Sequence, residues 1–189
     1  MRTLFTLAII VLLPCLLTAQ EKKRVPRMVP DHVKLQYAGG IGFLSVGFGY
    51  ESPNQKFQGD FYYGNVPAKW GGGRPIHSVT GKLTWLPLSR KLNRDIRLDI
   101  INAGILLNYT FGKQYFLFKP TPYPYQYYGF PTALNGVVFL GTGIRYQRFG
   151  LYYEVGSSGK DMLSYVKNTK SRAFSDILTM GVGLRYAVK

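Results

Sequence analysis

Apolar and polar residues alternate with a period of two along most of the chain. In the last alternating stretch, 178–188, large apolar side chains take every second position, and Thr, Gly, Arg and Ala lie between them. Because successive side chains of a strand point to opposite faces, this pattern predicts strands with one apolar and one polar face. The alternation predicts seven strands, in the stretches 40–51, 56–64, 77–85, 101–111, 137–146, 151–156 and 178–188.

Several of the apolar stripes contain or end in aromatic residues, and the opposite faces are rich in Gly, Ser, Thr and Asn. The aromatic residues are Tyr50, Tyr63, Trp85, Tyr109, Tyr146 and Tyr186. An apolar band bounded by aromatic girdles is typical of strands that face lipid, with the polar face lining a lumen. The fold predicted is therefore all-β: a closed antiparallel transmembrane β-barrel with long external loops. A soluble β-sandwich remains the alternative, since antiparallel sheets with one wet face also alternate.

Closure with antiparallel pairing favours an even number of strands, so we expect eight. The additional strand would come from about residues 29–37, although Pro26 and Pro30 remove backbone donors nearby. The alternative is that this segment threads the lumen.

The N-terminus has the layout of a secretory signal peptide. Arg2 precedes an apolar run from Leu4 to Leu17, and small residues follow. A retained membrane helix is the competing interpretation, but the run is short and contains Pro14. We therefore divide the chain into a signal peptide (1–19), a basic N-terminal tail (20–34) and a barrel (35–189). The single Cys15 would leave with the signal peptide, so no disulfide is expected.

The chain is strongly basic, with a formal net charge of +15. Such a charge favours polyanionic partners. An exported chain has little access to nucleic acid, so we expect no nucleic-acid partner. The predicted partners are outer-membrane lipid and the phosphates of lipopolysaccharide.

The signal peptide, the alternating strands and the last strand, LTMGVGLRYAV, together resemble the small bacterial outer-membrane β-barrel proteins of the eight-stranded type. The chain departs from them by running on past Tyr186 to Lys189. The resemblance implies location in the outer membrane of a Gram-negative bacterium. It also implies that the barrel assembly machinery is a partner during biogenesis.

The lengths of the connections predict the orientation of the barrel, because such proteins have short periplasmic turns and longer external loops. The short connections 52–55 and 147–150 would be periplasmic. The long connections 66–76, 112–133 and 157–174 would then lie outside.

Ionisable residues on the predicted lumen face form one candidate site. They are Glu51, Asp60, Lys82, Arg145, Glu154 and Arg185. Because buried charges are tolerated only when paired, we expect an ion-pair network that fills the narrow barrel, with Arg145 and Glu154 interacting. The alternative is a polar path for small solutes.

Candidates for catalysis are few. His77, Ser78 and Asp60 could form a nucleophilic set like those of barrel enzymes that modify lipid A. However, His77 and Ser78 are adjacent on one strand and should point to opposite faces. We therefore expect no catalytic residues, no cofactor and no metal site, because no His, Asp or Glu cluster has ligand spacing.

The external loops present aromatic and basic side chains. These are Tyr123, Tyr125, Tyr127, Tyr128, Lys167, Lys170 and Arg172. Such side chains suit contacts with lipopolysaccharide, and loop 112–133 also suits a protein partner. The function predicted is a structural or interaction role for a small outer-membrane barrel. The alternatives are a narrow solute channel and, less favoured, a lipid A-modifying enzyme.

Overall fold

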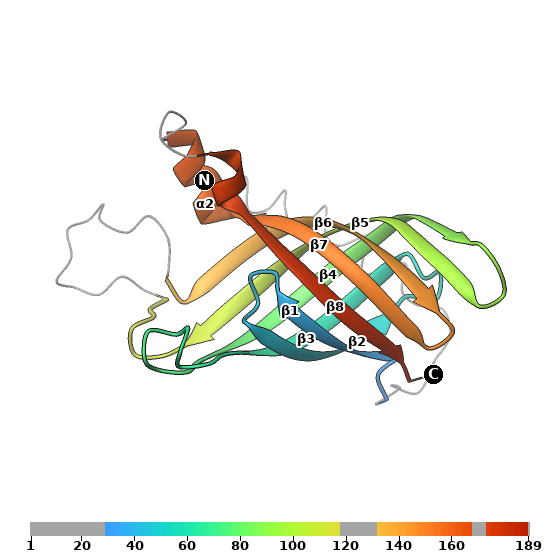
Figure 1. Cartoon of the computed structure of the whole chain (residues 1–189), viewed down its shortest axis with the longest axis horizontal. Helices are drawn as coiled ribbons and strands as arrows, with labels where there is room; N and C mark the ends of the chain where they lie inside the picture. Colours follow the sequence, from blue (N-terminus) through green and yellow to red (C-terminus); the bar gives the residue numbers. More distant parts are fainter. Residues whose placement is uncertain (1–28, 118–131, 168–172, 189) are drawn as a thin grey trace, which may run out of the picture.

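The computed structural model describes residues 29–117, 132–167 and 173–188. Within them, eight antiparallel strands follow one another in sequence order around a closed barrel (Figure 1). The barrel closes because β1 pairs with both β2 and β8. The predicted all-β, closed, eight-stranded antiparallel architecture is therefore confirmed.

The elements have the following bounds. The strands are β1 (His32–Ala38), β2 (Leu44–Glu51), β3 (Phe57–Val66), β4 (Ile76–Lys91), β5 (Ile96–Phe111), β6 (Leu134–Tyr146), β7 (Phe149–Ser158) and β8 (Leu178–Ala187). A helix, α2 (Gly159–Lys167), and a 3-10 turn, η1 (Phe174–Ile177), lie between β7 and β8. In the ranges that the structure describes, no helix is both long and apolar enough to cross a membrane.

The first strand comes from the N-terminal segment, as the even strand number required. β1 begins at His32, inside the segment predicted to be a basic tail, so the barrel starts before residue 35. Pro30 precedes the first ladder pair and costs the strand no backbone donor. From His32 onward, side chains alternate between buried and exposed positions up to Tyr37. A paired eighth strand therefore closes the barrel.

The two ends of the barrel differ in their connections. At one end, which we call the short-turn end, the strands are joined by 52–56, 92–95 and 147–148. At the other, the long-loop end, the connections are 39–43, 67–75, 112–133 and 159–177. Figure 1 shows α2 at the long-loop end and the C-terminus at the opposite end.

Irregular pairing changes the inward-facing set on β5. The register between β4 and β5 shifts between Trp85 and Ser89, a stretch that includes Pro87, which lacks a backbone donor. The register between β5 and β6 shifts between Asp99 and Asn102. As a result, Asp99 and Asn102 are both buried, although regular alternation would place them on opposite faces.

Glycines on the inner face make room for two tyrosines in the barrel interior. A Cβ added at Gly47 would lie 2.5 Å from Cδ1 of Tyr62, and one at Gly183 would lie 2.2 Å from Cζ of Tyr152. The Tyr62 hydroxyl lies 3.2 Å from the Tyr152 hydroxyl, so the two rings meet across the interior from β3 and β7. The inward glycines are therefore part of the packing of these rings.

Apolar side chains fill the interior nearer the long-loop end. Ile41, in the connection between β1 and β2, is completely buried. It belongs to a cluster with Tyr62, Leu106, Val137 and Phe139. The hydroxyl groups of Ser45 and Ser78 donate hydrogen bonds to the Ile41 carbonyl, at 3.1 and 3.0 Å, and hold this connection in place.

We expect Gly183→Ala to destabilise the barrel by about 1–3 kcal/mol, because the new methyl group overpacks against the Tyr152 ring. Gly81→Ala is the matched control, since a Cβ at outward-facing Gly81 would have no atom within 4 Å. Equilibrium unfolding by denaturant in detergent micelles measures both effects. Equal stability of the two variants would contradict this account of the interior.

Candidate functional site

The interior charges form three groups, of which the first surrounds Lys82 of β4. Its side chain has no solvent exposure, and Nζ lies 2.6 Å from both carboxylate oxygens of Glu154 on β7. Nζ also donates to Oε1 of Gln36 at 3.2 Å. It lies 4.6 Å from the centre of the Phe139 ring, within cation–π range. The Lys82–Glu154 pair therefore joins two non-adjacent strands through the interior.

The second group surrounds Asp60 of β3. Oδ1 of Asp60 lies 2.6 Å from Nε2 of His32, and Oδ2 lies 2.7 Å from Nζ of Lys34. Lys34 also donates to Oε1 of Gln58 at 2.9 Å. His32 and Lys34 lie on β1, so this group ties β1 to a strand that is not its neighbour in the sheet.

The third group lies nearest the short-turn end and has Glu51 of β2 at its centre. One carboxylate oxygen lies 2.8 Å from Nη1 of Arg145, and the other lies 3.0 Å from Nη2 of Arg185. Nε of Arg145 lies 2.6 Å from Oδ2 of Asp99, and Nε of Arg97 lies 3.3 Å from Oδ1 of the same carboxylate. β2 and β6, which carry Glu51 and Arg145, lie opposite each other in the ring of strands.

Each acid described on the inner face is paired with at least one base. The acids are Glu51, Asp60, Asp99 and Glu154, and the bases paired with them are His32, Lys34, Lys82, Arg97, Arg145 and Arg185. Transfer of an unpaired ion into such an interior would cost several kcal/mol, so mutual pairing is what makes this set tolerable. Together with the Tyr62–Tyr152 contact, the pairs fill the middle of the barrel.

The structure places all six residues of the sequence-predicted network on the inner face. The expected contact between Arg145 and Glu154 is wrong, because Arg145 pairs with Glu51 and Asp99 and Glu154 pairs with Lys82. The partners depend on the stagger of the strands, which alternation alone does not specify.

Sequence reasoning missed four members of the network: His32, Lys34, Arg97 and Asp99. The alternation that begins at His32 could have identified the first two, but the nearby prolines left open whether 29–37 pairs as a strand or threads the lumen, so no inward side chains were assigned there. Arg97 and Asp99 lie before the predicted strand 101–111, and there is a further reason why the inward position of Asp99 was not predicted. The register shift after it changes which parity of β5 points inward, and no motif in the sequence marks that shift.

The low-ranked catalytic candidates are not brought together. Nδ1 of His77 lies 2.6 Å from the Tyr63 hydroxyl, on the outer side of the sheet, whereas Ser78 is buried and donates to the Ile41 carbonyl. Asp60 is held by His32 and Lys34. The described residues also contain no group of three or more His, Cys, Asp or Glu side chains that could hold a metal ion.

The predicted external surface lies almost entirely outside the described residues. Tyr123, Tyr125, Tyr127, Tyr128, Lys170 and Arg172 lie outside the described residues. For Lys167 only the backbone, at the end of α2, is described.

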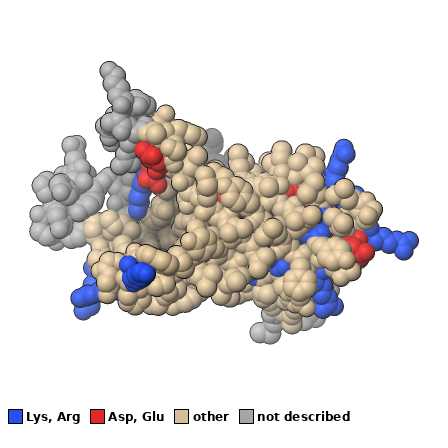
Figure 2. Space-filling view, in the orientation of Figure 1, with Lys and Arg blue, Asp and Glu red and all other residues tan. Residues whose placement is uncertain are grey.

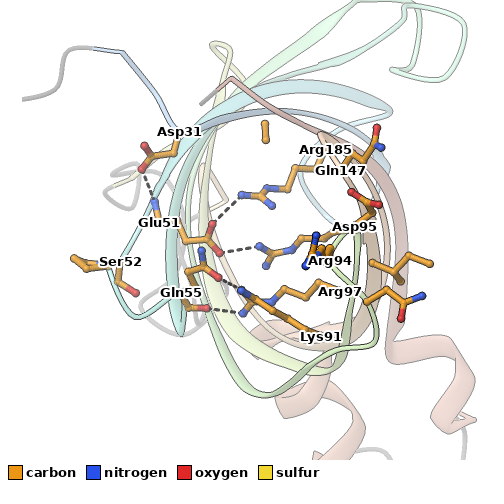
Figure 3. A pocket seen from close by; sticks show the side chains of 15 residues that line it. Asp31, Glu51, Ser52, Gln55, Lys91, Arg94, Asp95, Arg97, Gln147 and Arg185 are labelled. Atoms are coloured by element: carbon orange, nitrogen blue, oxygen red, sulfur yellow. Dashed lines mark hydrogen bonds and ion pairs between the residues drawn. The ribbon is translucent and has the colours of Figure 1, made fainter.

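A pocket of about 400 Å³ opens at the short-turn end, directly beside the Glu51 group. All three short connections contribute to its wall, through Ser52, Pro53 and Gln55, through Asn93 to Asp95, and through Gln147. In Figure 3 the side chains of Arg185 and Arg97 point across it toward Glu51 and Gln55. Arg97 donates to both the side chain and the backbone carbonyl of Gln55, which fixes its position.

Comparisons with protein-family models, with curated proteins and with solved structures found no match. The geometry alone therefore defines the class: a closed eight-stranded antiparallel barrel with an apolar outer face and a charge-paired interior.

We expect a double-mutant cycle between Lys82→Met and Glu154→Gln to give a large coupling energy. Either single change should cost on the order of 3–5 kcal/mol, because it leaves one buried polar or charged partner without its match. The combined change should then cost at least about 1 kcal/mol less than the sum. Equilibrium unfolding in detergent is the measurement.

The control cycle combines Arg145→Met with Glu154→Gln, which share no partner. Their effects should add to within about 0.5 kcal/mol. Strong coupling there, with none between Lys82 and Glu154, would show that the interior is paired differently.

Proposed function

We propose that this protein is a small barrel of the bacterial outer membrane, which crosses the bilayer with its eight strands and has a structural or interaction role. The observation that carries this proposal is the chemistry of the outer face. Large apolar side chains project from it on every strand, many of them about half exposed. Leu83 and Leu140 are each 62% exposed, although both lie within strands.

The apolar outer face is far more extensive than a water-soluble monomer tolerates, since exposed apolar patches there rarely exceed a few hundred Å². In Figure 2 the middle of the barrel is almost free of charged atoms, and most Lys, Arg, Asp and Glu atoms lie toward the two ends. This distribution is typical of a surface that faces hydrocarbon between two polar boundaries. Strands β3, β7 and β8 have 10 residues each, a length suited to tilted crossing of a bilayer.

Aromatic residues border the apolar band near both ends. Outward-facing rings near the short-turn end are Tyr50, Phe57, Trp85, Tyr146, Phe149 and Tyr186. Those nearer the long-loop end are Tyr37, Tyr63, Tyr109 and Phe111. Two such belts of aromatic side chains, one near each end, support a membrane position in which each belt lies in a lipid headgroup region.

The long-loop end is proposed to lie outside the cell and the short-turn end in the periplasm, in keeping with the connection lengths of such barrels. The described part of the long-loop end carries Lys69, Arg74, Lys113 and Lys160. These cations suit the phosphate groups of lipopolysaccharide. A structural or interaction role is favoured over a solute channel because paired side chains cross the interior at several levels.

We expect Val182→Arg to reduce stability in a lipid bilayer by about 2–4 kcal/mol, because it places a charge in the middle of the apolar band. Val182 is on β8 and faces outward between Tyr37 and Tyr153 of the neighbouring strands. Val188→Arg is the control, since it lies beyond the end of β8, where a long side chain can reach water. Equal stability of both variants in lipid vesicles would refute the membrane placement.

Cysteine labelling on intact cells tests the orientation. A cysteine at exposed Lys69, in the 67–75 connection, should react with a membrane-impermeant maleimide. A cysteine at exposed Asn54, in the 52–56 connection, should react only after the cells are lysed. The reverse result would invert the barrel, and equal reaction of both sites before lysis would argue against an outer-membrane position.

A further inference from the structure

The pocket at the short-turn end has an excess of positive charge. Its basic residues are Lys91, Arg94, Arg97, Arg145 and Arg185, and its acidic residues are Asp31, Glu51 and Asp95. Lys91 and Arg94 are exposed at the rim and form no ion pair with any other described residue. The other inner-face charges are Lys34, Lys82, Asp60, Asp99 and Glu154, which carry no positive excess, so the excess is confined to this mouth.

Two guanidinium groups in the pocket wall have donors without a hydrogen-bond partner in the described part of the chain. Nη2 of Arg145 and Nε of Arg185 are both buried and have no hydrogen-bond partner among the described residues. Leaving a buried donor unpaired costs about 1–3 kcal/mol, and more for a charged group. These donors therefore favour an additional acceptor.

The same two arginines are already fixed in place. Arg145 is held by Glu51 and Asp99, and Arg185 is held by Glu51. A ligand that pairs with them would restrict few further side-chain rotations, which lowers the entropic cost of binding. Each of these two guanidinium groups keeps one buried unpaired nitrogen, so each can donate to one further oxygen.

We propose that this pocket is a binding site for a small oxyanion, a soluble molecule carrying a phosphate or carboxylate group. The fixed arginines Arg145 and Arg185 would meet the anionic group at the inner wall, and Lys91 and Arg94 would attract it at the rim. The pocket lies among the three short connections, away from the apolar outer band, which fits a soluble ligand better than a lipid headgroup. In the proposed orientation it opens to the periplasm.

Isothermal titration calorimetry on the folded barrel, in a neutral detergent at about 0.15 M ionic strength, tests this site. The probes are inorganic phosphate and citrate, which separate a preference for phosphate from one for carboxylate. We expect saturable binding of at least one probe with one site per barrel. The double variant Lys91→Gln/Arg94→Gln should weaken it about tenfold, as expected for loss of one charge-assisted contact.

The matched control is Arg90→Gln/Lys56→Gln. It removes the same charge from exposed positions at the same end, but neither residue lines the pocket. The affinity of this control variant for the probe should change less than about twofold, since exposed charges that do not line the pocket are largely screened. Heat-modifiable migration on gels checks that all variants are folded.

Absence of saturable binding of both probes would overturn the proposal. Equal weakening of probe binding by the two double variants would also overturn it, because binding would then depend only on the overall positive charge of this end. The measurement uses detergent micelles, so its failure would leave the membrane position, tested by Val182→Arg in vesicles, unaffected.

Discussion

Closure of eight strands leaves an interior that side chains alone can fill, and this constraint governs the rest of the molecule. Every second residue must point into a narrow space, so a large inward side chain needs a small one opposite it, as Tyr152 has in Gly183. An inward charge must likewise find its opposite inside the barrel, because water has little access there. The balanced pairs around Lys82, Asp60 and Glu51 satisfy this requirement.

The part of the fold that could be predicted from sequence is the part encoded by alternation. Period-two stripes identified seven strands and the side chains that face inward, since a strand's two faces are a local property. The position of Glu51 and Lys82 in the alternation also identified both side chains as inward-facing. The choice of partners could not be predicted, because it depends on the stagger between strands. A single register shift after Asp99 was enough to hide that residue. The register of β6 on β7 sets Arg145 opposite Gly150 and Glu154 opposite Gly141, so the predicted pair does not form.

The side chains that fill the interior differ between the two ends of the barrel. Near the long-loop end, Ile41 and an apolar cluster fill the interior, and paired ions fill the middle. At the short-turn end, the pairing around Glu51 gives way to an open pocket and to arginine donors that have no partner among the residues the structure describes. Along the barrel axis, the interior therefore changes from apolar side chains near the long-loop end, through paired charges in the middle, to an excess of cations at the short-turn end.

The ion pairs that skip over a neighbouring strand have a consequence for how the barrel is assembled. Strand pairs from β1–β2 to β7–β8 join segments close in sequence, whereas β1–β8 joins the two ends of the chain, a contact that is slow to form. Arg185 of β8 reaches past β1 to Glu51 of β2, and Lys34 of β1 reaches past β2 to Asp60 of β3. The first pair crosses the seam between β8 and β1, and the second fixes β1 to the strands on the other side of it, so together they hold the seam closed. Local opening of the barrel should therefore be least frequent at the one junction where the chain has no covalent connection.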